Sequence, residues 1–157
     1  MAGLLSRLIL TGVIRSALAL EAEAVSEYEQ LRAQAERSRG RTHQLGDSLS
    51  HILEEERLHV RILEDTGAGG ISLPRLEGLL REHASPGLTD VKPLDADGLA
   101  QWERGLSSAL EHEEKTWIFY GNLRRSSRVP AVRKAFEVLA AMEKEHLDIL
   151  RRLLGRA

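Results

Sequence analysis

Apolar side chains recur at intervals of three and four residues along most of this chain, and this spacing restricts it to helices that bury one face. The segment from residue 132 to residue 153 is the clearest case. Its inner face carries Val132, Phe136, Leu139, Glu143, His146, Leu150 and Leu153. A carboxylate buried there without a partner would cost roughly several kcal/mol or give up its charge. Glu143 and His146 therefore predict polar partners or a metal ion inside the fold.

Four long segments with helical spacing organise the chain, and strand-like alternation is absent. The expected helices run from about Thr11 to Arg39, Thr42 to Asp65, Asp97 to Ser127 and Pro130 to Leu154. The first ends at Gly40, and prolines and glycines interrupt the pattern between the second and third. Only LPRLEGLLREHA predicts a short helix there. We expect one all-α domain over residues 1–157, a four-helix bundle of two antiparallel hairpins joined by a long crossover.

Composition excludes several classes of site and partner. The chain has 157 residues, a formal net charge of -2 and no cysteine, so it has no thiolate-bound zinc or iron centre of its own. The intermixed charges give no basic surface for nucleic acid. Arg7 and Arg15 divide the apolar N-terminal segment into runs too short for a signal peptide or a membrane span. We expect a cytoplasmic protein that binds neither nucleic acid nor membrane.

The segment LEEERLHVRIL repeats the arrangement of AMEKEHLDIL, because it also places a glutamate and a histidine three residues apart on an apolar face. That face contains Leu45, Leu49, Ile52, Glu56, His59 and Leu63. A carboxylate and an imidazole at i and i+3 lie on the same side of a helix, within reach of one ion or of two adjacent ions. One Glu-x-x-His pair is a weak signal, but two pairs on apolar faces predict a metal site.

The first and third helical segments each carry one glutamate within an apolar face, followed by a tyrosine two turns later. The first face comprises Leu10, Ile14, Ala17, Glu21, Ala24, Tyr28, Leu31 and Ala35. The third comprises Leu99, Trp102, Leu106, Leu110, Glu113, Trp117 and Tyr120. The chain thus repeats a Glu-Tyr pair followed by Glu-x-x-His. Four carboxylates would neutralise two divalent ions, and oxygen-rich ligation with one imidazole per ion suits iron or manganese better than structural zinc.

The stretches ALEAEAVSEY, LEEERLH, LEHEEKTWIFY and FEVLAAMEKEHLDIL together resemble the ferritin-like superfamily, and most closely its rubrerythrin-like branch. The resemblance implies a ferritin-like four-helix bundle that holds two iron ions in a carboxylate site. The ligands that it implies are Glu21, Glu56, His59, Glu113, Glu143 and His146. It further implies that Glu56 and Glu143 bridge the two ions, and that each histidine binds one of them.

The third helix offers more than one candidate ligand. The resemblance to rubrerythrins implies two carboxylates three residues apart in this helix. Glu111 and Glu114 have that spacing. Helix geometry favours Glu113, because Glu114 lies about 100° and Glu111 about 160° around the helix from it. We expect Glu113 to be the metal ligand from this helix, with Glu114 as the alternative candidate.

Several residues allow a structural interpretation beside the functional one. The six polar residues would also suit a metal-free network of Glu-His pairs and tyrosine hydrogen bonds. Tyr28 and Tyr120 are expected to be core residues with satisfied hydroxyls, or alternatively to take part in the chemistry next to the ligands.

Residues beyond the six have simpler expected roles. Trp102 and Trp117 are expected to pack in the core. Arg32 and Arg124 would contact the ligands or extend from the edge of the apolar face into solvent. The histidines expected at the surface are His43, His51, His83 and His112.

Two classes of function fit this sequence. The first is an oxidoreductase in which a pair of ferrous ions reduces hydrogen peroxide or dioxygen, with electrons returned by an external donor protein. The second is a metal-handling or structural protein, either a ferroxidase that feeds an iron store or an assembly subunit whose site stabilises the bundle. We expect a homodimer that covers apolar surface of the N-terminal LLSRLIL or of the crossover.

Overall fold

The computed structural model describes residues 2–38, 43–83, 88 and 90–156, with side chains from residue 7 onward within these ranges. The described residues form helices and no strands, so the predicted all-α class is confirmed. The helices are α1 (Ala2–Arg37), α2 (His43–Gly67), α3 (Leu73–Glu82), α4 (Ala96–Ser126) and α5 (Pro130–Leu153). Within the described part of the chain, no helix has the length and apolar character needed to cross a membrane.

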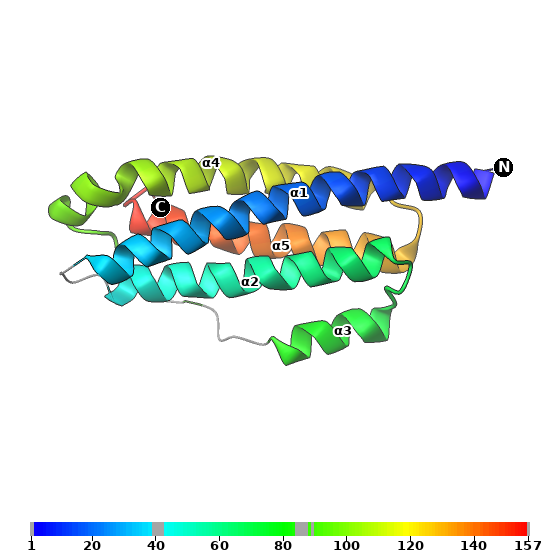
Figure 1. Cartoon of the computed structure of the whole chain (residues 1–157), viewed down its shortest axis with the longest axis horizontal. Helices are drawn as coiled ribbons and strands as arrows, with labels where there is room; N and C mark the ends of the chain where they lie inside the picture. The colour runs from blue at the N-terminus through cyan, green and yellow to red at the C-terminus, as the bar shows by residue number, and fades with distance from the viewer. Residues whose placement is uncertain (1, 39–42, 84–87, 89, 157) are drawn as a thin grey trace.

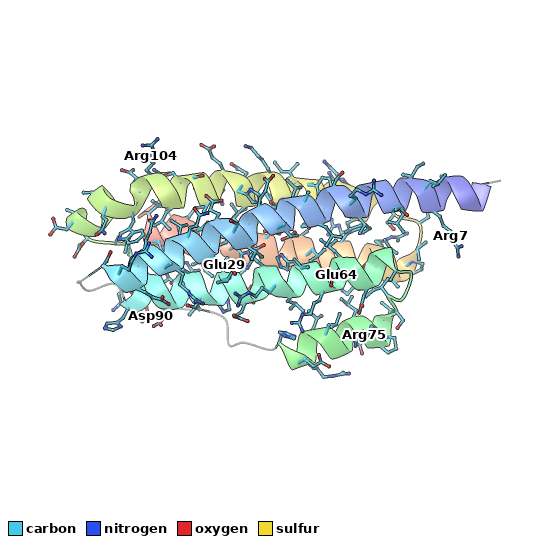
Figure 2. The ribbon with its side chains drawn as sticks, in the orientation of Figure 1. Arg7, Glu29, Glu64, Arg75, Asp90 and Arg104 are labelled. Atoms are coloured by element: carbon cyan, nitrogen blue, oxygen red, sulfur yellow. The ribbon has the colours of Figure 1, made fainter. Side chains whose placement is uncertain are left out.

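The four long helices lie side by side, and the short α3 lies outside them (Figure 1). α1 packs along α2, and α4 packs along α5, so consecutive long helices form two hairpins. The hairpins meet where α1 contacts α4 and where α2 contacts α5. α3, which belongs to the crossover between the hairpins, contacts α2 and α5. Charged side chains such as Arg104 and Arg7 point away from the bundle (Figure 2).

The start of α1 differs from its prediction. The helix begins at Ala2 rather than near Thr11. Thr11 does not cap a helix, because its hydroxyl donates a hydrogen bond to the carbonyl of Arg7, one turn earlier, at 2.9 Å. The predicted boundary between the first two helices lies outside the described residues, at Arg39, Gly40 and Thr42.

The other helix ends lie close to their predicted positions. The side chain of Asp95 caps α4 by accepting a hydrogen bond from the Gly98 amide at 2.8 Å. Pro130 occupies the first turn of α5, where its missing amide hydrogen leaves no bond unmade. The crossover therefore ends at a capped helix, and the turn between α4 and α5 is short.

Two apolar clusters fill the interior, and polar residues separate them along the helices. One cluster includes Leu49, Leu106 and Leu150, and the other includes Ile62 and Phe136. Every long helix contributes to both clusters, and in each helix a buried glutamate lies between the two contributions. These glutamates are Glu21, Glu56, Glu113 and Glu143. The fold thus collects the polar residues at mid-length of the helices, between two apolar layers.

The buried face of α4 is rotated relative to its prediction. The buried residues are Trp102, Leu106, Ala109, Glu113, Thr116 and Tyr120. Trp117 is 36% exposed, so its predicted core position is wrong, and Leu110 is only partly buried, at the edge of the first apolar cluster. Ala109 and Thr116 lie on the opposite side of Glu113 from these two residues, some tens of degrees around the helix. A Cβ at Gly105, on the Ala109 side, would lie 2.8 Å from Leu31 of α1. The close approach of α1 and α4 on this side explains the small residues there.

The rotation predicts different effects for the two tryptophans. We expect Trp102→Ala to lower the free energy of unfolding by about 3–5 kcal/mol, because it empties a fully buried position. Trp117→Ala should lower it by about 1 kcal/mol or less, because this indole is partly solvated. Urea unfolding of both variants measures the difference. Equal losses would contradict the orientation of α4, and with it the inward direction of Glu113.

Candidate metal centre

Six polar side chains meet between the two apolar clusters, and the four long helices supply all of them. They are Glu21 from α1, Glu56 and His59 from α2, Glu113 from α4, and Glu143 and His146 from α5. Each is at most 1% exposed. The helical period explains their convergence, because each residue occupies the position in the apolar face that points toward the common axis. The structure therefore brings together all six residues that the sequence singled out.

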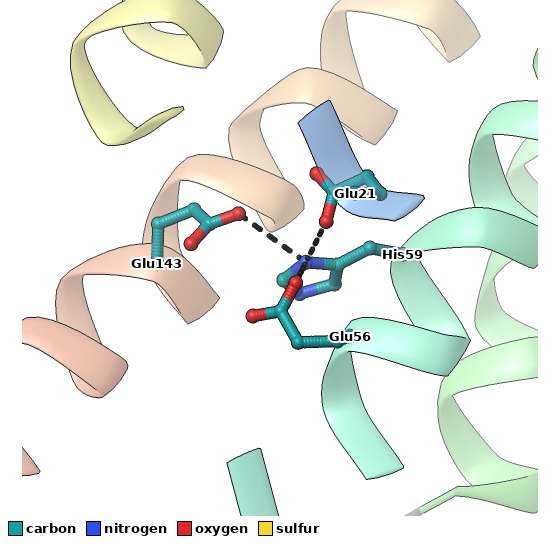
Figure 3. A group of neighbouring side chains, drawn as sticks. All are labelled: Glu21, Glu56, His59 and Glu143. Carbon is teal, nitrogen blue, oxygen red and sulfur yellow. Dashed lines mark hydrogen bonds and ion pairs between the residues drawn. The ribbon is translucent and has the colours of Figure 1, made fainter. Parts of the chain in front are cut away.

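The first group of side chains surrounds the Nδ1 atom of His59 (Figure 3). This nitrogen lies 3.3 Å from Glu21 Oε2 and 3.3 Å from Glu143 Oε1. Glu56 Oε2 is 3.6 Å away. One donor atom from each of these four residues lies within 4.8 Å of all the others. Three carboxylates and one imidazole thus converge on a volume that could hold one ion.

The second group surrounds the Nδ1 atom of His146. Glu56 Oε1 lies 2.9 Å from this nitrogen, Glu113 Oε2 lies 3.6 Å away and Glu143 Oε2 lies 3.7 Å away. The four donor atoms again lie within 4.8 Å of one another. The two groups share Glu56 and Glu143, and each of these carboxylates turns one oxygen toward each histidine. The side chains therefore suit two adjacent ions that share two carboxylates.

The two tyrosines make a crossed pair of hydrogen bonds to the terminal glutamates. Tyr28 of α1 donates to Glu113 of α4, and Tyr120 of α4 donates to Glu21 of α1. Burial, followed by the charge of Glu113, holds the pKa of Tyr28 well above its ordinary value. Burial and the charge of Glu21 do the same for the pKa of Tyr120. Both hydroxyls are therefore satisfied, keep their protons, and contact the side chains that would bind metal.

Several buried atoms of the centre have no hydrogen-bond partner in the described part of the protein. They are both carboxylate oxygens of Glu56 and of Glu143, Oε2 of Glu113, Nδ1 of His146, and Nε2 of His59. Glu56 Oε1 and His146 Nδ1 are only 2.9 Å apart, yet they are not aligned for a hydrogen bond. A satisfied metal-free network would pair these atoms. Unpaired oxygens that face an imidazole nitrogen fit metal coordination better, and the donor set suits iron or manganese.

The carboxyl groups titrate unusually because they are buried together. Burial, followed by the charge of Glu56, raises the pKa of Glu21 from 4.5 to about 7. Burial and the charge of Glu113 hold the pKa of Glu143 well above its ordinary value. Burial also acts to raise the pKa of Glu56, but the two neighbouring histidines outweigh it and bring that pKa well below its ordinary value. Without metal, the centre therefore holds protons on some carboxyl groups and charge on others.

The imidazoles respond to the same carboxylates. Burial acts to lower the pKa of His59, but the charges of Glu56, Glu21 and Glu143 outweigh it and raise the pKa well above 6.5. The pKa of His146 is raised in the same way, chiefly by its contact with Glu113. A metal ion would have to displace these protons, so binding and proton release are coupled at this centre.

The alternative candidate on α4 lies outside the cluster. The side chain of Glu114 is 53% exposed, and its carboxylate lies 3.8 Å from Arg151 of α5. Glu111 is also exposed. Of the acidic residues in this part of α4, only Glu113 reaches the other ligand candidates within the described residues.

Two residues near the centre were not identified from the sequence. Glu55 Oε2 lies 2.8 Å from Nε2 of His146, on the side of the imidazole that faces away from the other carboxylates. Glu55 Oε1 lies 3.6 Å from His51, and His51 is only 8% exposed, so the predicted surface position of His51 is wrong. Glu55 directly precedes Glu56, at the edge of the apolar face. Its contact with α5 depends on how α2 and α5 pack, which helical spacing does not reveal.

The remaining candidates lie away from the centre. His43 is exposed, while His83 and His112 are half-buried, and His83 contacts Arg61 of α2. Arg32 forms an ion pair with Glu36 at 3.3 Å, and Arg124 is exposed. Of the expected surface histidines, only His43 is fully exposed.

Comparison with known protein families, with curated proteins and with solved structures finds no match for this chain. The assignment of a function therefore depends on the side chains of the centre and their geometry.

The raised pKa values predict how the stability of the metal-free protein depends on pH. Glu21 binds its proton more tightly when folded, so its contribution is complete below about pH 4.5 and is lost as the pH rises through about 7. The raised pKa values of Glu143 and both histidines act in the same direction, and each contribution is lost as the pH rises through that group's own folded pKa. The shift of Glu21 from 4.5 to about 7 corresponds to a loss on the order of 3 kcal/mol. Urea unfolding of the metal-free protein between pH 5 and pH 8 measures it.

Glu21→Gln provides the control, because an amide at this position cannot titrate and should flatten the profile. If the metal-free protein instead became steadily more stable from pH 5 to pH 8, the carboxyl groups would not share protons as the structure indicates.

Proposed function

We propose that this chain is a ferritin-like protein of the rubrerythrin-like type, which reduces hydrogen peroxide or dioxygen while two bound ferrous ions are oxidised. The observation that carries the proposal is the pair of four-residue groups that share Glu56 and Glu143. The proposed ligands are Glu21, Glu56, His59, Glu113, Glu143 and His146. A ferritin-like bundle is the fold in which two helices give one glutamate each and two give Glu-x-x-His, and this chain has that distribution.

The six proposed ligands would have two kinds of role, bridging both ions or binding one of them. Glu56 and Glu143 would bridge the ions, while Glu21 and Glu113 would each bind one ion and be held in place by a tyrosine hydroxyl. When bound, iron supplies the electrons, so that each peroxide takes up two electrons and two protons and leaves as water. The apolar clusters on both sides exclude bulk water from the centre. Manganese would suit the same donor atoms.

The number of carboxylate ligands that α4 supplies affects whether the ions would react preferentially with peroxide or with dioxygen. With Glu113 as the only ligand from this helix, each ion would have one terminal glutamate, one histidine and the two shared carboxylates. Such matched ligation favours reaction with either oxidant. A preference for peroxide of the rubrerythrin type would need a second carboxylate from α4, but Glu114 is directed toward Arg151. The chain has no cysteine, so the electrons that reduce the ions again would come from an external donor protein.

The second candidate function is metal handling without redox turnover, as in an iron-storage or assembly subunit. The observation that favours it is the burial of all six side chains, which also suits an ion that stabilises the helices permanently. The two functions differ in the fate of the oxidised ions. A catalyst returns to the ferrous state with a reductant and turns over repeatedly, whereas a structural site keeps its ions.

Anaerobic addition of ferrous iron to the metal-free protein tests the proposal. We expect about two iron ions per chain by elemental analysis, because two groups of ligands are present. Iron at about 100-fold excess over its dissociation constant should add roughly 2.7 kcal/mol per ion to the free energy of unfolding. Rapid mixing with peroxide and with dioxygen should oxidise the ions in both cases, followed by optical absorption.

Glu113→Ala and Glu114→Ala form a matched pair for the same experiment. The first variant should lose one ion, while the second should keep both and react normally, because Glu114 lies at the surface. Stoichiometry near zero in the wild-type protein would refute the centre. Loss of iron in Glu114→Ala alone would show that the ligand on α4 is wrong.

We also propose that two copies of the chain form a homodimer through the N-terminal end of α1. Leu8 and Ile9 are 62% and 61% exposed, and Val129 nearby is 55% exposed. Ile9 and Val129 line the same apolar hollow at this end of the molecule. Light scattering should give a mass of about two chains, and the double variant Leu8→Glu with Ile9→Glu should give one. A wild-type monomer would contradict the proposal, and the mass of a closed shell of many copies would favour iron storage.

A further inference from the structure

The two histidines of the centre differ on the side that faces away from the carboxylates. Nε2 of His146 lies 2.8 Å from Glu55 Oε2 and makes a hydrogen bond with it. Nε2 of His59 has no hydrogen-bond partner in the part of the chain that the structure describes. Both rings are fully buried and lie nearly parallel, with their centroids 5.5 Å apart. The difference therefore arises from the neighbouring side chains and not from exposure to water.

The contact with Glu55 determines how His146 would meet an ion. A carboxylate accepts hydrogen bonds, so the hydrogen of a neutral His146 ring lies on Nε2. Nδ1 then presents its lone pair to the group formed by Glu56, Glu113 and Glu143. A carboxylate on the far side of a ligating imidazole also fixes the ring orientation and increases its basicity. Within the described residues, Nε2 of His59 has no such contact, and the ring is held only through its other nitrogen, by the hydrogen bond between Nδ1 and Glu21 on the side of the carboxylates.

The Glu-x-x-His segments of α2 and α5 differ at the two positions that give His146 its contact with Glu55. The residue before the glutamate of Glu-x-x-His is Glu55 in α2 but Met142 in α5. Four positions earlier, α2 has His51, which lies 3.6 Å from Glu55, whereas α5 has Val138. Met142 and Val138 are partly buried and pack against an apolar cluster. The two positions on α2 are therefore polar and support His146, whereas the equivalent positions on α5 are apolar.

We propose that the two metal positions are unequal, and that the position formed by Glu56, Glu113, Glu143 and His146 binds its ion first. Glu55 is the positioning residue that makes it the tighter of the two. This inference rests on the proposed two-metal function and deepens it. Removal of such an outer contact reduces metal affinity by about 10–100-fold, which sets the expected difference between the two binding steps.

Anaerobic titration of the metal-free protein with ferrous iron against a competing chelator measures both steps. In the wild-type protein we expect two steps that differ by about 10–100-fold in dissociation constant. His146→Ala should remove the tighter step, and His59→Ala should remove the weaker one. Each binding step is assigned to a histidine from the measured dissociation constants, so the result does not depend on catalytic activity.

Substitution of Glu55 tests its role directly. Glu55→Met copies the residue found in α5 and should weaken the tighter step by about 10–100-fold, so that the two steps merge. Glu55→Gln keeps an acceptor for His146 and should retain part of the difference. Glu54→Met is the matched control, because Glu54 is exposed, contacts Arg57 and should leave both steps unchanged.

The reciprocal variant Met142→Glu should strengthen the weaker step, a gain that a damaged fold would not produce. Two equal steps in the wild-type protein would overturn the inequality while leaving the two-metal function intact. An unchanged tighter step in Glu55→Met would overturn the role of Glu55. Failure of the wild-type protein to bind iron would overturn both the inequality and the proposed function.

Discussion

The burial of four carboxylates and two imidazoles at one level of the interior is the constraint on which the rest of this structure depends. Each of these side chains is at most 1% exposed, so water cannot satisfy them. Unpaired, they would oppose folding by roughly several kcal/mol each. The apolar clusters at both ends of the helices hold them there. Proton sharing and hydrogen bonds offset part of the penalty, and metal ions would offset more.

The polar contacts also join the two hairpins. The crossed tyrosine-glutamate bonds connect α1 with α4, and the bond from His146 to Glu55 connects α5 with α2. In each of these pairs the two helices belong to different hairpins, so the contacts determine how the hairpins dock. Apolar packing alone tolerates small rotations of a helix, whereas a buried hydrogen bond requires one register. The chemistry of the centre and the geometry of the fold therefore depend on the same residues.

The centre is nearly symmetric in its candidate ligands and asymmetric in the residues around them. Each half of the chain gives one glutamate with its tyrosine and one Glu-x-x-His pair. The surroundings differ, because Glu55 and His51 stand where the other half has Met142 and Val138. Ligand type determines which metals can bind, while surroundings determine how tightly and in which order. Fold alone does not decide between the two proposed functions, catalysis and metal handling.

The sequence by itself determined the helices and most of their inner faces, because the helical period places residues such as Glu21, Glu56 and Glu143 on one side without any tertiary contact. It also indicated that these residues share a buried level. Only the tertiary structure decided that Trp117 turns partly outward and that His51 is buried beside Glu55. These outcomes depend on the distance and rotation between packed helices, which are set by small residues and contacts far apart in the chain.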